Sequence, residues 1–171
     1  MSVTRYAWLG VVGGLVGAVF MSMVEMTNEL IVGHSFFLPP HMIAAPIVGK
    51  APMEHAMMNG PLYLEWGPFL LGLALHMMWT AGWGLAFGLI ASAARLVSVA
   101  AFWWGIAYGL AVGFVMSYAV LPIAGLDPLP KTSGWAPFFL MHIAYGAGPG
   151  LVLWYATRQR VSQVGEVRRA A

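Results

Sequence analysis

Two histidines stand inside apolar stretches that nearly repeat each other. The segments His76–Leu85 and His142–Leu151 share His, Ala, Gly, Gly and Leu at the same offsets, and Trp79 aligns with Tyr145. An ionisable side chain at membrane depth is costly, and by default it marks a functional site. One hypothesis is that His76 and His142 are the two axial ligands of a haem b in a membrane electron carrier.

Small residues near the two histidines suit this haem hypothesis. Trp79 and Tyr145 would flank the macrocycle. The glycines that would make room for it are Gly72, Gly82, Gly146 and Gly148. A second hypothesis is a copper site, because thioethers and imidazoles are soft ligands that suit Cu(I). The sequence has 12 methionines and no cysteine. The candidate copper ligands are Met21, Glu25, His34, His41, His55 and Met116.

Composition indicates that these residues lie in a membrane. Hydrophobic residues make up 60% of the 171-residue chain and charged residues only 8%, which is too little polar surface to cover a soluble globule. Since a bilayer core needs about 20 helical residues, we expect spans at about 7–26, 68–92, 98–121 and 136–157. The predicted fold is an all-α integral membrane four-helix bundle, a single domain over residues 1–171.

The first and third predicted helices match each other as well. Gly10, Gly14, Leu15, Met21 and Ser22 have the spacing of Gly105, Gly109, Leu110, Met116 and Ser117. This pattern predicts two tandem two-helix repeats, at about 7–92 and 98–157, followed by a tail at 158–171. The glycine ladders of the first and third helices predict that these two helices pack together.

An insertion at about 30–60 interrupts the first repeat. Its prolines forbid one continuous helix, so we expect an irregular or re-entrant outer segment, which places methionines such as Met53, Met57 and Met58 near the outer face. With a rise of about 1.5 Å per residue, Met21, Met116 and both repeated histidines fall in one layer of the outer half of the membrane. We expect Ser22 and Ser117 to bond back to their own helices.

Basic residues predict the orientation. One side of the spans holds Arg5, Arg95, Arg158, Arg160, Arg168 and Arg169, and the other holds only Lys50 and Lys131. By the positive-inside rule both termini are cytoplasmic, in what we expect to be a prokaryotic inner membrane. The sequence has no basic, aromatic-interleaved surface of the kind that binds nucleic acid.

The motifs resemble those of a family of small four-helix prokaryotic membrane proteins known only as a domain of unknown function. They are Gly10-x3-Gly14-x6-Met21-Ser22, His76-x5-Gly82-x-Gly84-x2-Phe87-Gly88 and His142-x2-Tyr145-Gly146-x3-Gly150. This resemblance covers roughly residues 7–154 and implies the four-helix fold, without an established activity or cofactor.

The sequence contains no Ser-His-Asp arrangement, phosphate loop or paired acid-base carboxylates, so we expect no enzymatic activity. The leading hypothesis is a non-catalytic accessory or assembly subunit of a larger membrane complex, such as a respiratory or other redox complex. Its expected partners are the lipid bilayer and other membrane subunits. The haem b electron carrier and the copper-binding protein are the alternatives.

Overall fold

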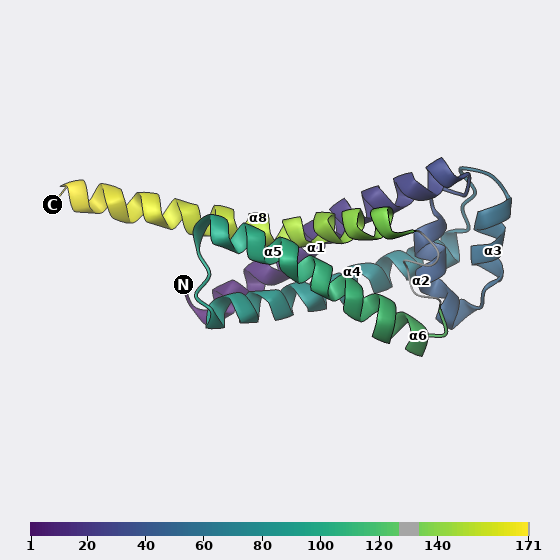
Figure 1. Cartoon of the computed structure of the whole chain (residues 1–171), viewed down its shortest axis with the longest axis horizontal. Helices are drawn as coiled ribbons and strands as arrows, with labels where there is room; N and C mark the ends of the chain where they lie inside the picture. Colours follow the sequence, from purple (N-terminus) through teal and green to yellow (C-terminus); the bar gives the residue numbers. More distant parts are fainter. Residues whose placement is uncertain (127–133, 171) are drawn as a thin grey trace.

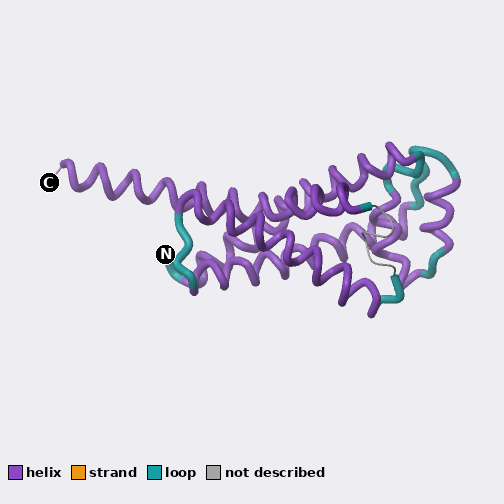
Figure 2. Tube along the Cα trace, in the orientation of Figure 1, coloured by secondary structure: helices purple, strands orange, loops and turns teal. Residues whose placement is uncertain are grey.

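The computed structural model describes residues 1–126 and 134–170, and these parts contain helices and no strand (Figure 2). The elements are α1 (Val3–Val32), α2 (Leu38–Val48), α3 (Ala51–Met58), α4 (Trp66–Ala93), α5 (Ser98–Val115), the π-helical turn η1 (Met116–Val120), α6 (Leu121–Ile123) and α8 (Trp135–Ala170). Both termini lie at one end of the bundle, and α2 and α3 lie at the other (Figure 1).

Four segments are long and apolar enough to cross a membrane, namely Val3–Val32, Trp66–Ala93, Ser98–Ile123 and Trp135–Arg158. Each contains one of the predicted spans, so the all-α, four-span prediction is confirmed. The last helix continues as far as Ala170 and extends past the other helices (Figure 1). The segment predicted as a tail is therefore helical.

Glycines on two faces of α1 hold the bundle together. Gly10 and Gly14 face α4, where a β carbon added to Gly14 would lie 2.9 Å from the Cα of Gly84. Gly13 and Gly17 face α8, and a β carbon on either would collide with backbone atoms there. Residues four apart share a helix face, so the two glycine pairs let two neighbouring helices approach α1 closely.

The prediction that the first and third helices pack together is wrong. α1 packs along α4 and α8, α5 packs along α8, and the described residues give α1 and α5 no extended interface. The glycines of α5 instead face α8, where Gly105 lies against Gly146 and Gly150. A small-residue ladder shows that a helix has a close neighbour, but it carries no information about which helix that neighbour is.

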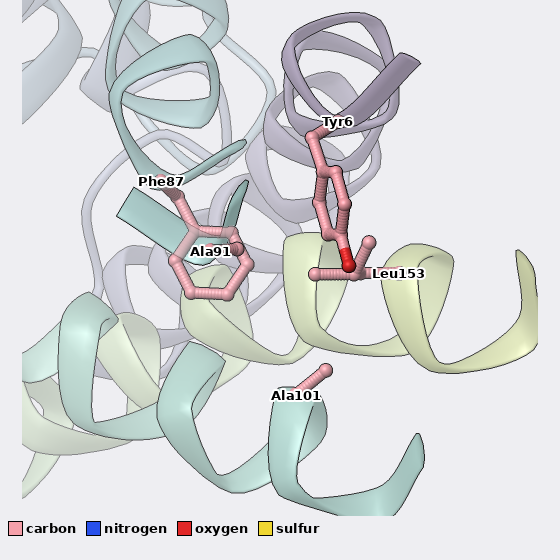
Figure 3. Packing of buried hydrophobic residues seen from close by; sticks show 5 residues of the cluster. All are labelled: Tyr6, Phe87, Ala91, Ala101 and Leu153. Atoms are coloured by element: carbon pink, nitrogen blue, oxygen red, sulfur yellow. The ribbon is translucent and has the colours of Figure 1, made fainter. Parts of the chain in front are cut away.

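A cluster of buried side chains closes the bundle at the end that carries the termini. All four long helices contribute to this cluster, which consists of Tyr6, Phe87, Ala91, Ala101 and Leu153 (Figure 3). The Tyr6 hydroxyl donates a hydrogen bond of 3.0 Å to the carbonyl of Leu96, just beyond α4. This end of the bundle is therefore tightly packed.

The segment between α1 and α4 forms two short helices, α2 and α3, so the irregular form of the expected outer insertion is wrong, and the re-entrant form stays a prediction. Three of its prolines lie where helices start, Pro39 and Pro40 in the first turn of α2 and Pro52 in the first turn of α3, whereas Pro46 lies inside α2. Proline is favoured in the first turn because the first-turn N–H groups have no helical partner. α2 packs against α4, where the absence of a side chain at Gly72 admits the carbonyl of Pro40.

Two glycines of α4 allow a matched test of this packing. We expect Gly84→Ala to destabilise the protein by about 1–3 kcal/mol, the usual cost of overpacking, because the new methyl group would meet the backbone of Gly10 and Gly14. A methyl group at Gly82 would meet no atom within 4 Å, so Gly82→Ala should be neutral or stabilising by up to about 1 kcal/mol. Unfolding in mixed micelles by titration with SDS measures both, and equal stabilities would contradict the glycine contacts.

Candidate ligand site in the bundle

A cavity of about 350 Å³ lies near the end of the bundle that carries α2 and α3. Its walls come from α1, α2, α4, η1 and α6, together with the start of α3 and the residues that follow α6. The polar side chains among these walls are Glu25, Lys50, His76 and the indole of Trp79. The remaining walls are apolar or thioether, as is typical of ligand sites with a few placed polar groups.

Five methionines from five different elements converge on this cavity. They are Met21 of α1, Met42 of α2, Met53 of α3, Met78 of α4 and Met116 of η1. Met141 of α8 is different, because it is 0% exposed and packs within the bundle without lining the cavity. Close packing is the usual role of a methionine in a core, and the cavity methionines depart from it.

His76 lies in the wall of the cavity with 9% of its surface exposed. Its ring interacts with the backbone of Ala18 on α1. Its Nε2 atom is buried and has no hydrogen-bond partner. Since buried polar atoms are nearly always paired, an unpaired imidazole nitrogen beside a cavity is a candidate contact for a ligand.

The π-helical turn η1 contributes Met116 to the cavity. The indole N–H of Trp79 on α4 donates a hydrogen bond of 3.0 Å to the Met116 sulfur, which holds this thioether in place. Short π-helical turns within α-helices occur frequently at functional sites.

The next residue in this turn, Ser117, is fully buried, and its hydroxyl has no hydrogen-bond partner. The expectation that Ser117 bonds back to its own helix is therefore wrong. The i→i+5 pattern of the turn moves the carbonyls that such a bond would need.

His142 lies outside the walls of the cavity. It is 1% exposed, and its Nδ1–H donates a hydrogen bond of 2.8 Å to the carbonyl of Phe138, one turn earlier in α8. The ring packs over Gly113 of α5, where an added β carbon would lie 2.5 Å from the imidazole. Its Nε2 is also buried without a partner. The structure therefore places His76 at the cavity and His142 in a packed helix interface.

The surroundings of His142 give the haem hypothesis no support. Two axial histidines must face each other across an open slot for the macrocycle. Of the four glycines expected to make this room, Gly72, Gly146 and Gly148 lie against the backbone of neighbouring helices, and Gly82 has no neighbour within 4 Å. Bis-histidine haem ligation stays a prediction from the sequence.

The three histidines near α2 and α3 have separate surroundings. The Nδ1 atom of His34 lies 2.7 Å from a carboxylate oxygen of Glu29. His41 is fully buried and uses both ring nitrogens, since its Nδ1–H donates to the Phe37 carbonyl at 2.7 Å and its Nε2 accepts from the Glu65 N–H at 3.2 Å. His55 is exposed.

These three histidines do not line the cavity. Over residues 1–126 and 134–170 no group of three His, Asp or Glu side chains is placed to hold a metal ion. Of the six candidate copper ligands, the structure brings together Met21, Glu25 and Met116 at the cavity.

Three cavity methionines, Met42, Met53 and Met78, were not among the candidate copper ligands expected from the sequence. Met42 follows the buried His41, and Met78 lies two residues after His76. Residues two apart do not share a helix face, so periodicity alone would not group Met78 with His76. The signal available in the sequence is the excess of methionine around the repeated histidines.

Because both ring nitrogens of His41 are used within the protein, we expect it to have a structural role. His41→Ala should cost at least about 1–3 kcal/mol of stability, because it leaves the Glu65 N–H without its acceptor. His55→Ala is the matched control, and an exposed substitution of this kind should change stability by less than about 0.5 kcal/mol. Thermal unfolding in detergent measures both variants. Equal stabilities would show that His41 does not anchor α2 to the start of α4.

Comparisons with protein-family models, with curated proteins and with solved structures find no match to this chain. The resemblance to small four-helix prokaryotic membrane proteins of unknown function therefore stays a prediction. The cavity and its side chains are the basis for a functional proposal.

Proposed function

We propose that this chain is a non-catalytic membrane protein that holds a ligand in the cavity between its helices. The observation that carries the proposal is the cavity of about 350 Å³, whose walls come from elements far apart in the sequence. A preformed, mostly apolar cavity with a few polar groups is the usual form of a ligand site. The unpaired Nε2 of His76 is one such group.

The chemistry of the cavity walls favours holding a ligand over transforming one. Glu25 lies in α1, His76 lies in α4, and Lys50 lies between α2 and α3. Among the described contacts no hydrogen bond or ion pair joins any two of them. General acid-base or nucleophilic catalysis needs such groups within hydrogen-bond reach of each other or of the substrate.

A protein of this kind would serve as an accessory or assembly subunit of a larger membrane complex. The start of α5 presents two aromatic side chains outward, Trp103 and Trp104, which are 63% and 59% exposed. Exposed tryptophans of this kind suit a membrane interface or the surface of a neighbouring membrane subunit.

We expect the native protein, extracted in a mild detergent, to migrate with other membrane polypeptides in a native gel. The Trp103→Ala and Trp104→Ala double variant should weaken that association if the start of α5 contacts the partner. Trp8→Ala is the matched control, because Trp8 is a similarly exposed tryptophan on α1. Migration of the untreated native protein as a single polypeptide would count against a role as an accessory subunit.

We also propose that the bundle consists of two tandem two-helix units, α1 with α4 and α5 with α8. In support, glycines at matching sequence positions, Gly10 and Gly105, each face the second helix of their own pair. The two histidines also have matching neighbours, since His76 meets the backbone of Ala18 and His142 packs on Gly113, and these two positions align. Gly10 lies against Gly84 and Gly88, whereas Gly105 lies against Gly146 and Gly150, so the pairs differ in register by one turn.

The proposed orientation places both termini in the cytoplasm of a prokaryotic cell and the cavity near the outer face. It rests on the distribution of arginine and lysine. The common position of the two termini at one end is in keeping with it (Figure 1). In this orientation α2 and α3 are an outer insertion that covers the bundle. Lys131, which contributes to the charge pattern, lies outside the described residues.

Because this chain has no cysteine, a single introduced cysteine is the one thiol in it that can be labelled. In whole cells we expect a small, membrane-impermeant thiol reagent to label Lys50→Cys at the exposed edge of the cavity, and Met42→Cys more slowly inside it. Ala44→Cys is the control, because Ala44 lies in α2 but is fully buried and does not line the cavity.

The three variants test the orientation of the chain and the accessibility of the cavity separately. Labelling of Lys50→Cys only in inverted membranes would contradict the orientation. Equal labelling of Met42→Cys and Ala44→Cys, in purified protein with a permeant reagent, would contradict an accessible cavity and with it the holding of a ligand there.

A further inference from the structure

We propose that the ligand held in this cavity is a soft monovalent metal ion, Cu(I), bound by methionine thioethers and the imidazole of His76. The inference rests on the proposed ligand-holding function and names the class of ligand. It differs from the copper site expected from the sequence, because His34, His41 and His55 are not involved and His76, Met42 and Met53 are.

The choice of metal follows from the donor atoms. Thioethers and imidazoles are soft or borderline ligands that favour Cu(I), whereas hard cations need carboxylates and carbonyls. The cavity walls contain five methionines, one histidine and one glutamate. The described residues provide no group of three His, Asp or Glu side chains for a zinc or magnesium site, so the donor set discriminates between these metals.

The fold places methionine thioethers from separate elements in the walls of one cavity. Met21, Met53 and Met116 are far apart in the sequence and reach the cavity from α1, α3 and η1. Each of these three side chains is only partly buried, so its sulfur is not consumed by close packing. The hydrogen bond from the Trp79 indole occupies one lone pair of the Met116 sulfur and orients the other.

His76 provides a second, independent observation. Its Nε2 is buried without a partner in a wall of the same cavity, and the ring interacts with the backbone of Ala18. A histidine that binds a metal through one nitrogen usually has its other nitrogen fixed by a backbone carbonyl or a carboxylate. At His76 the backbone group beside the ring is that of Ala18.

The charges of the site suit a monovalent cation. A cation buried at membrane depth is costly unless an opposite charge lies near it, and Glu25 is the acidic side chain in the cavity wall. One carboxylate and one Cu(I) form a neutral pair. Lys50 also lines the cavity but is exposed, so its ammonium group can remain in water, as long basic side chains generally do.

Binding of Cu(I) to the full-length protein in detergent tests the proposal. Cu(I) is added under reducing conditions in competition with a colorimetric Cu(I) chelator. We expect one Cu(I) per chain and X-ray absorption dominated by sulfur neighbours. The double variant Met21→Leu with Met116→Leu should bind at least roughly 10- to 100-fold more weakly, the loss that removing even a supporting group of a metal site causes.

Matched variants separate a metal site from general packing. Leucine nearly matches methionine in volume, so the fold should survive these changes, and thermal unfolding checks that it does. Met141→Leu is the control, because Met141 is buried in α8 away from the cavity, and its affinity for Cu(I) should equal that of the unchanged protein. Met53→Leu gives a second test in the short helix α3 in case the double variant does not fold.

Equal Cu(I) affinities in the unchanged protein, the double variant and Met53→Leu would overturn the proposal, as would a protein that takes up no Cu(I). The labelling of Met42→Cys then shows which statement has failed. If that cysteine is still labelled more than Ala44→Cys, the protein has an accessible cavity for a ligand of another class, such as an apolar ring compound. If the two cysteines react equally, the ligand-holding function has failed as well.

Discussion

Close contact between helix backbones is the interaction on which the rest of this structure depends. Lipid offers no hydrophobic driving force between membrane helices, so their association relies on van der Waals packing at small residues. α1 supplies these contacts on two faces, with Gly10 and Gly14 against α4 and Gly13 and Gly17 against α8. α1 thereby becomes the shared helix of the bundle, because it packs along both α4 and α8, and α5 joins the bundle by packing along α8.

This arrangement explains why one end of the bundle is closed and the other contains a cavity. At the end with the termini, Tyr6, Phe87 and Leu153 bring α1, α4 and α8 together (Figure 3). α4 packs mainly on α1 and α5 mainly on α8, and at the opposite end other elements fill the space between α4 and α5. α2 packs against α4 there, and η1 and α6 form the far wall. The cavity is the space that these elements leave.

Polar groups in the membrane region are placed in two ways. Several are satisfied within the protein, such as the Tyr145 hydroxyl, which donates 3.0 Å to the carbonyl of Thr80 and so links α8 to α4. Others are buried without a partner, including Nε2 of His76 and the Ser117 hydroxyl. Unsatisfied groups of this kind are costly and rare. Of these two residues, His76 lies in the cavity wall, where a bound ligand would compensate the cost, whereas Nε2 of His142 is unpaired within a packed helix interface.

The sequence by itself determined the strongly apolar composition, the number of segments long enough to span a membrane and the candidate ligand residues. Hydrophobic content and segment length decide these properties, and neither depends on which helices pack together. His76, His142, Met21, Glu25 and Met116 stand out by residue type.

Only the tertiary structure decided which of these residues lie close together. Gly10 and Gly105 look alike in the sequence, yet the partner of each glycine depends on which helix can approach it. Pro39, Pro40 and Pro52 suggest breaks in the sequence, but they lie in the first turns of α2 and α3. His76 and His142 match in motif, but a cavity beside α4 and a packed face between α5 and α8 give them different surroundings, because a local pattern holds no information about the space that distant elements leave open.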